Sequence, residues 1–358
     1  MIFRSLFSAF KRPPKPVLGL DIGSHSIKLV ELVHNGSGRS VRCFGRAILP
    51  PKAIVDGSIK EPDQVARVVK ALLQNIRPKT RRTATSIAGY SVIVKKVVVP
   101  YIQEREIEDN LVIEAENYVP FEIEEVYIDF FMLKSQEEQD EKTGTPIFLV
   151  AAKKEVVDEY ADLIQEVGLV PAVVDVDAFA LGNALEGVYG QLPEAVAIVD
   201  IGAQKTNLNI VYQGASCFAR DMALGGIQLT DAISEATGLE YQEAERVKIS
   251  GTDDEALKKE VAKVCSEICH LWAEELKKAL DFFRSNSNSQ EHPTYLFLSG
   301  GCALLKGLDA VFEHELSMPV RIFDPWKDYE TDKNIDEKYQ ALVAPQMTIA
   351  TGLALRTI

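Results

Sequence analysis

The feature that most constrains the fold of this chain of 358 residues is an internal repeat of one short motif. Residues 18–23 read LGLDIG, and residues 197–202 read AIVDIG. In each copy an apolar strand runs into Asp-Ile-Gly, then into a small polar turn and a second strand. Asp200 follows Asp21 by 179 residues, about half the chain. The spacing predicts two similar halves that can present the same turn to one another across a cleft.

The pattern between the two motifs predicts an α/β protein, because strand-like and helix-like segments alternate along the chain. The expected strands are 17–20, 27–33, 85–99, 126–133, 147–152, 169–176, 196–199, 207–212 and 295–298. The expected helices are 62–76, 103–118, 154–167, 178–185, most of 225–284, one that starts within 303–308, and 345–355. The loop at 187–193, GVYGQLP, is the strongest candidate for a domain boundary.

The charge balance excludes one large class of partners. The chain has 39 Lys and Arg against 53 Asp and Glu, a net charge of −14. Such a surface repels phosphate backbones, so general nucleic-acid binding is not expected. A local cradle of backbone N–H groups can still bind a nucleotide. Five cysteines at wide spacing, with no CxxC, predict a reducing cytoplasmic compartment without a disulfide framework.

The first residues form a separate pattern. Ile2, Phe3, Leu6, Phe7 and Phe10 would share one face of a helix, surrounded by basic residues, and a Pro-rich stretch at 13–16 ends it. Such a segment can lie on an anionic membrane surface, dock on a partner, or fold onto its own domain, and the sequence leaves these alternatives open. No apolar run approaches the roughly 18 residues of a membrane span.

The two Asp-Ile-Gly turns carry the chemistry. An Asp at the end of a buried strand holds a carboxylate at a fixed point, and a Gly two residues later allows a tight turn that exposes N–H groups. Ser24, Ser26 and Thr206 can add hydroxyls. A concave run of N–H groups binds anions, and two such turns backed by carboxylates suit a polyphosphate with Mg²⁺.

A third motif lies at 296–308, where LFLSGGCALLKGL reads as a strand, a Gly-Gly pair and a helix. Paired glycines allow a flat group to approach the backbone closely. A close-packed turn without a ligand is the alternative for this motif alone, and the two Asp-Ile-Gly turns favour the ligand.

Together, these segments resemble the five nucleotide-binding motifs of the actin-like ATPase superfamily. Segments 18–32 and 197–211 resemble its two phosphate motifs, 296–308 its adenosine motif, and Asp177 and 345–355 its connecting helices. Within the superfamily the chain resembles the FtsA branch and, most closely, the PilM family of type IV pilus assembly. The supporting residues are 20–32, the stretch EAENYVPF at 114–121, and 200–207.

The resemblance implies an actin-like (ribonuclease H-like) two-lobed fold with an FtsA-type inserted subdomain. The implied parts are a basic leader (1–16), the first lobe (17–90 and 173–194), the insertion (91–172), the second lobe (195–344) and a C-terminal helix that returns toward the first lobe (345–358).

The resemblance also implies roles for individual residues, with ATP or ADP and Mg²⁺ as cofactors. Asp21 and Asp200 would bind the metal ion, Asp21 through a water molecule. Asp177 would position an attacking water, although this residue can equally be a plain helix N-cap. The residues implied in nucleotide binding are Gly23, Ser24, Ser26, Gly202, Lys205, Thr206, Glu245, Lys248, Gly300, Gly301 and Ala303. Glu245 and Lys248 would lie near ribose and base, and the alternative for this pair is an exposed salt bridge.

The second turn departs from the pattern of brisk ATPases. Ala203, Gln204 and Lys205 replace a glycine run, and Asn207 stands where relatives often have Asp. The departure indicates a slow ATPase at most, although Lys205 could supply a positive charge to the phosphates.

The resemblance implies a cytoplasmic scaffold at the inner face of the bacterial inner membrane. Its partner would be the N-terminal cytoplasmic peptide of PilN, with other pilus assembly proteins and self-association as further possibilities. The alternatives are an FtsA-like filament-forming division protein and a small-molecule kinase on the same fold.

Overall fold

The computed structural model describes residues 15–35, 38–133 and 144–357. It divides into two compact units, one of residues 1–180 and 350–358 and one of residues 181–349. The division falls within two helices, α4 (Asp177–Tyr189) and α10 (Thr348–Ala354). The basic leader expected at 1–16 lies outside the described residues, except for Lys15 and Pro16.

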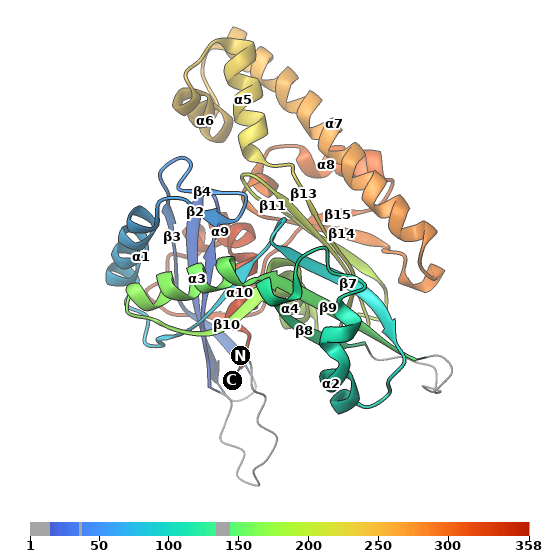
Figure 1. Ribbon diagram of the computed structural model, residues 1–358. Helices are drawn as coiled ribbons and strands as arrows, with labels where there is room; N and C mark the ends of the chain where they lie inside the picture. Colours follow the sequence, from blue (N-terminus) through green and yellow to red (C-terminus); the bar gives the residue numbers. More distant parts are fainter. Residues whose placement is uncertain (1–14, 36–37, 134–143, 358) are drawn as a thin grey trace. The chain divides into compact units, whose positions relative to one another are not determined.

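The first unit is built on a mixed sheet in which strands run in the order β10-β6-β1-β2-β3. Strands β10, β2 and β3 of this sheet are labelled in Figure 1. β1 pairs antiparallel with β2 and parallel with β6. The elements of this unit are β1 (Leu18–Ile22), β2 (Ser26–Asn35), β3 (Gly38–Ile48), β4 (Ile54–Val55), β5 (Ser58–Ile59), α1 (Pro62–Ile76), β6 (Arg82–Ile87), β7 (Val92–Val99), α2 (Glu104–Ala115), β8 (Val126–Met132), β9 (Thr145–Lys153), α3 (Lys154–Glu166) and β10 (Val170–Val176).

The second unit repeats this sheet, with the order β13-β12-β11-β14-β15. Its central strand β11 pairs antiparallel with β12 and parallel with β14, as β1 does with β2 and β6. Its elements are β11 (Val196–Ile201), β12 (Thr206–Tyr212), β13 (Ala215–Met222), α5 (Gly226–Thr237), α6 (Tyr241–Ser250), α7 (Glu255–Ser285), β14 (Tyr295–Ser299), α8 (Leu308–Leu316), β15 (Val320–Ile322), β16 (Glu330–Thr331) and α9 (Glu337–Val343). The predicted α/β class and the duplication of its motif are both present.

Alternating apolar residues explain how each sheet is covered. Leu18, Leu20 and Ile22 share one face of β1 and pack with α1 and α3 in a single core. In the second unit the corresponding face of β11 packs with α5, α7 and α8, and Trp272 of α7 is among the largest fully buried side chains. The long helix α7 crosses this face in Figure 1.

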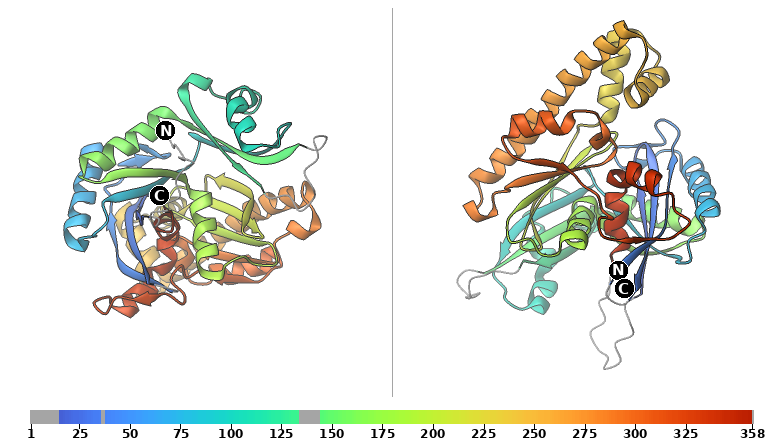
Figure 2. Two further views of the ribbon diagram at one scale, coloured as in Figure 1. Left: turned by 90° about the horizontal axis from the view of Figure 1, so that it is seen from below. Right: turned by 180° about the vertical axis from the view of Figure 1, so that it is seen from behind.

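A second, smaller sheet in the first unit has the order β7-β9-β8 and lies beside α2 (Figure 2). Ile107, Leu111 and Ala115 of α2 share a core with this sheet. Strands β7, β8 and β9 and helix α2, which all fall within the insertion expected at 91–172, thus share one core. Helix α3, which was expected in the insertion, contributes to the core of the first sheet instead.

Several expected boundaries differ from the structure, and two of them lie at helix ends near the predicted domain boundary and the third motif. Helix α4 continues to Tyr189, so the first residues of the loop expected at 187–193 are helical; the helix is followed by Gly190, whose φ of 66° is accessible to glycine without strain. The helix expected to start within 303–308 begins only at Leu308, because a 3-10 turn over Gly301–Leu304 comes first.

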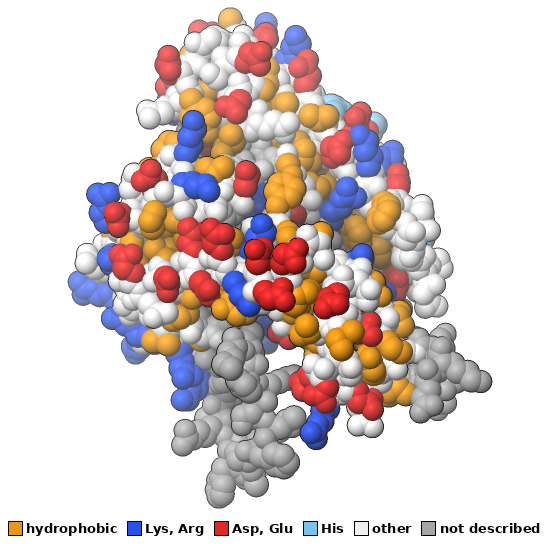
Figure 3. All heavy atoms as spheres, viewed as in Figure 1, with side chains coloured by type: hydrophobic (Ala, Val, Ile, Leu, Met, Phe, Trp, Pro, Cys, Tyr) orange, Lys and Arg blue, Asp and Glu red, His pale blue; other side chains and the backbone are white. Residues whose placement is uncertain are grey.

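The surface is acidic, as the net charge predicts. Glu155, Asp158, Asp162 and Glu166 are exposed along one side of α3, and carboxylates gather over this helix in Figure 3. Among the described residues, no helix combines the length and apolar character that crossing a membrane requires.

Candidate functional site

The first Asp-Ile-Gly turn is a hairpin that places a carboxylate beside an ammonium group. Gly23 N donates to Ser26 O at 3.2 Å, which closes the turn between β1 and β2. Asp21 then lies opposite Lys28 in the strand register, and Lys28 Nζ contacts Asp21 Oδ2 at 2.9 Å. Asp21 is buried, with 7 % of its surface exposed. Lys28 was not predicted as a site residue, although the pairing across a four-residue turn is the signal that identifies it.

The second turn has the same register. Gly202 N donates to Lys205 O at 2.9 Å, and Asp200 lies opposite Asn207. A serine on the neighbouring strand β14 completes the arrangement, because Ser299 Oγ donates to Asp200 Oδ2 at 2.6 Å. Ser299 was not predicted as a site residue, and it directly precedes the Gly-Gly pair of the third motif.

Asp177 has a serine partner of its own. Ser86 Oγ donates to Asp177 Oδ1 at 2.6 Å, and both residues are buried. Ser86 follows Thr85, which pairs with Leu20, so Ser86 holds in the first sheet the place that Ser299 holds in the second. Asp177 is the first residue of α4, and its carboxylate is oriented by the sheet.

The carboxylates of the first unit share one electrostatic neighbourhood. Burial raises the pKa of Tyr160, and the charges of Asp177 and Asp21 raise that pKa further. Carboxylate oxygens are the ligands that divalent cations such as Mg²⁺ prefer, directly or through water. Among the described residues, no three His, Cys, Asp or Glu side chains converge to hold a metal.

The turn residues that were expected to contact phosphates differ in their exposure to solvent. Gly23, Ser24, Gly202 and Lys205 are partly exposed. Ser26 is buried.

Thr206 is also buried, and its hydroxyl donates to Leu224 O at 2.9 Å, so in this arrangement its proton is engaged within the protein.

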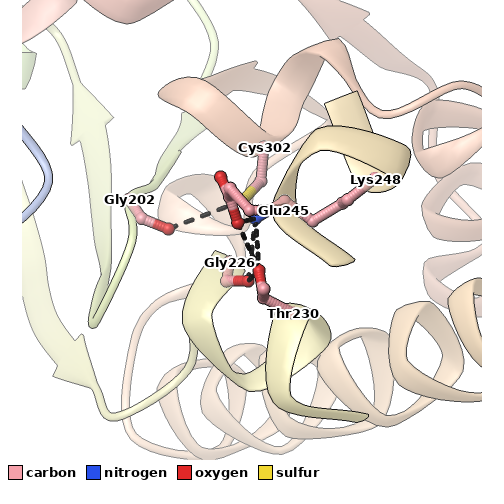
Figure 4. A network of polar contacts seen from close by, with 6 residues as sticks. All are labelled: Gly202, Gly226, Thr230, Glu245, Lys248 and Cys302. Carbon is pink, nitrogen blue, oxygen red and sulfur yellow. Dashed lines mark hydrogen bonds and ion pairs between the residues drawn. The ribbon is translucent and has the colours of Figure 1, made fainter. Parts of the chain in front are cut away.

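The residues expected near adenosine form a polar network in the second unit (Figure 4). Lys248 Nζ and Glu245 Oε2, one helical turn apart on α6, are 2.6 Å apart. Thr230 of α5 bonds to both side chains. Thr230 was not predicted, because its proximity to α6 depends on how the two helices pack.

The two glycines of the Gly-Gly pair have different surroundings. Gly300 has φ of 88°, and a Cβ there would lie 2.5 Å from Ile201 O, so this position requires glycine. Gly301 is exposed, and a Cβ there would meet no atom within 4 Å, so its backbone is open to approach. Ala303, by contrast, is buried in the apolar core.

Cys302 joins the third motif to the second turn. Its Sγ lies 3.5 Å from Gly202 O, and burial raises the pKa of this thiol to about 12. The thiol is therefore neutral at physiological pH and acts as a weak donor within the packing.

Comparisons with known proteins agree with this architecture. A profile of the family "Type IV pilus assembly protein PilM" matches residues 19–358. A solved "PilM-PilN type IV pilus biogenesis complex" contains a chain that is 30 % identical, with a TM-score of 0.83; the match covers 96 % of this chain and 99 % of that chain.

Two more distant relatives support the actin-like fold. MreB 5 of Spiroplasma citri bound to AMPPNP is 13 % identical with a TM-score of 0.52, and the match covers 94 % of each chain. The cell division protein FtsA of Staphylococcus epidermidis is 24 % identical over 257 residues, 64 % of this chain and 53 % of that protein. The chain thus spans about half the length of the FtsA proteins it matches. Because the PilM profile extends over nearly all of the described chain, this protein belongs to the PilM family of type IV pilus assembly proteins, with an actin-like α/β fold.

Proposed function

We propose that this protein is a nucleotide-binding scaffold of type IV pilus assembly, located on the cytoplasmic face of the inner membrane. The observation that carries the proposal is the duplicated Asp-Ile-Gly hairpin, with identical register around Asp21 and Asp200, in a chain of the PilM family. ATP or ADP with Mg²⁺ is the proposed ligand.

The residues present fit such a ligand. The partly exposed turns at Gly23 and Gly202 offer backbone N–H groups for phosphates, and Asp21 and Asp200 offer carboxylates to Mg²⁺ or its waters. Gly301 is exposed and has no atom that would block a base or ribose from approaching its backbone, and Glu245 can accept a hydrogen bond from a ribose hydroxyl. When bound, Mg²⁺ would neutralise phosphate charge.

Slow turnover is part of the proposal. Ala203, Gln204 and Lys205 give the second turn less backbone freedom than a glycine run. Asp177, held by Ser86, is the carboxylate proposed to orient a water. The nucleotide would then act mainly by stabilising one conformation of the scaffold.

Nucleotide binding is tested by calorimetry with ATP and Mg²⁺ on the full chain and on Gly301→Ala. The added methyl group meets no protein atom, so the melting temperature should stay unchanged while ATP affinity falls at least about tenfold. Absence of ATP binding to the parent would refute the proposed cofactor. Equal affinity of the two proteins would refute the placement of the ligand beside Gly301.

The proposed protein partner is the N-terminal cytoplasmic peptide of PilN, because the structural neighbour at 30 % identity is a PilM-PilN complex. A fluorescent peptide of that sequence should bind the full chain, and a scrambled peptide of equal composition should not. Equal binding of both peptides would contradict specific recognition. Other pilus assembly proteins and self-association are further proposed contacts, measurable by co-purification and by sedimentation.

A further inference from the structure

The ammonium group of Lys248 has all its hydrogen-bonding capacity engaged inside the second unit. Nζ contacts Gly226 O at 3.0 Å, Thr230 Oγ1 at 2.8 Å and Glu245 Oε2 at 2.6 Å. An ammonium group has three N–H donors, so each has a partner. The side chain is 9 % exposed, which leaves little surface for a ligand.

Thr230 completes this arrangement from the neighbouring helix. The residue is fully buried, its hydroxyl accepts from Lys248, and the hydroxyl proton lies within donating distance of two acceptors, Glu245 Oε2 and Gly226 O. A hydroxyl has one proton and two lone pairs. It therefore links the cation and the carboxylate through one atom.

Glu245 is the member of the network with an oxygen available. Both hydrogen bonds from Lys248 and Thr230 go to Oε2, and none from the described residues reaches Oε1. The Glu245 side chain is 20 % exposed, about twice the exposed fraction of Lys248. A carboxylate held through one oxygen presents the other in a defined direction.

The same network reaches the second Asp-Ile-Gly turn through Gly226. Gly226 N donates to Gly202 O at 3.0 Å, while its carbonyl accepts from Lys248. A Cβ on Gly226 would lie 2.9 Å from Cys302 Sγ, so the packing leaves no room for a side chain. Figure 4 shows these groups gathered between α5, α6 and the turn.

We propose that Lys248 and Thr230 are positioning residues, which hold Glu245 ready to accept a hydrogen bond from a ribose hydroxyl without contacting the nucleotide themselves. The inference rests on the proposed nucleotide binding and makes that site selective for a ribonucleotide. Under this inference Lys248 does not contact the ligand, as the resemblance implied, but orients the carboxylate of Glu245.

The test compares four proteins: the full parent chain, Thr230→Val, Thr230→Ser and Thr237→Val. The valine at 230 keeps the shape and removes the hydroxyl, and the serine keeps the hydroxyl. Thr237 is the matched control, because it lies on the same helix and its hydroxyl bonds, among the residues that the structure describes, only to Ile233 O and Leu239 N. For each protein the affinities for ATP, 2′-deoxy-ATP and 3′-deoxy-ATP are measured with Mg²⁺, and melting temperatures establish folding.

The parent, Thr230→Ser and Thr237→Val should prefer ATP over at least one deoxy analogue by about tenfold, which corresponds to about 1.4 kcal/mol. Thr230→Val should lose this preference, because its ATP affinity falls to the level of that analogue. A parent that binds ATP and both analogues equally would overturn the inference and leave nucleotide binding intact. An equal loss of affinity for all three nucleotides in Thr230→Val would show a structural role alone and would also overturn it. A parent that binds no nucleotide would refute the proposed function itself.

Discussion

At the scale of single residues, the carboxylates are oriented by neighbours that are far away in the sequence. Asp200 is held by Ser299 and Asp177 by Ser86, each at 2.6 Å. A hydrogen bond to a charged group contributes about 1.5–3 kcal/mol, enough to keep a buried carboxylate in one rotamer. The two serines occupy equivalent strands of the duplicated sheets, so the duplication extends to the support of the site.

The two glycines of the third motif should respond differently to the same substitution. Gly300→Ala forces a side chain into a left-handed backbone conformation and against Ile201 O, so we expect the free energy of unfolding to fall by at least about 2 kcal/mol. Gly301→Ala adds a methyl group in open space and should change it by less than about 0.5 kcal/mol. Chemical denaturation of both variants measures the difference. Similar stabilities would contradict the close approach to Ile201.

The buried thiol of Cys302 should make stability depend on alkaline pH. Burial raises its pKa from 9.0 to about 12, so the folded chain keeps a proton that the unfolded chain releases. The contribution of the protonated thiol to the free energy of unfolding is therefore complete below pH 9. It is lost as the pH rises from 9 toward 12, at about 1.4 kcal/mol per pH unit. Urea denaturation from pH 8 to 10.5, compared with Cys302→Ala, isolates this contribution. Parallel pH curves for the two proteins would contradict it.

At the scale of elements, helix ends and close contacts decide where the segments begin and pack. Helix α10 lies so close to β1 that a Cβ on Gly19 would be 1.9 Å from Ala350 O.

Helix α1 was predicted to the residue, because Pro62 starts it and its apolar residues repeat at helical spacing. The strands at 38–48 and 215–222 were not predicted, since their residues are only partly buried and lack a clear alternation.

The N-terminus of α7, a helix of 31 residues, depends on one aspartate. Asp254 Oδ1 accepts from Ala256 N at 2.9 Å and from Leu257 N at 3.1 Å. Asp254→Ala should lower the free energy of unfolding by about 1 kcal/mol, the usual contribution of an N-cap. Asp253→Ala removes the same charge one residue earlier, without a capping bond, and should have a smaller effect in thermal denaturation. Equal effects would assign the loss to charge rather than to the cap.

At the scale of the whole molecule, ligand binding should increase the free energy of unfolding. If the folded chain binds ATP with Mg²⁺, a ligand concentration of 100 times Kd adds about 2.7 kcal/mol to the free energy of unfolding. The melting temperature should rise with the logarithm of ATP concentration. EDTA should reduce the rise, because Mg²⁺ is proposed to link the phosphates to Asp21 and Asp200. A rise that is unaffected by EDTA would contradict the metal, and no rise at any concentration would contradict the nucleotide.

The sequence by itself determined the duplicated α/β architecture and the two carboxylate hairpins. Strand, Asp, Gly and strand follow one another directly, so hydrophobic burial and the freedom of glycine act within a few contiguous residues. Lys28 supports Asp21 through the hairpin register, within one contiguous segment of the chain. Only the tertiary structure decided the other supports of the carboxylates: Ser86 and Ser299 through the strand order, and Thr230 through the packing of α5 on α6. Such contacts join residues that are distant in sequence, and they depend on sheet order and helix packing that no local pattern encodes.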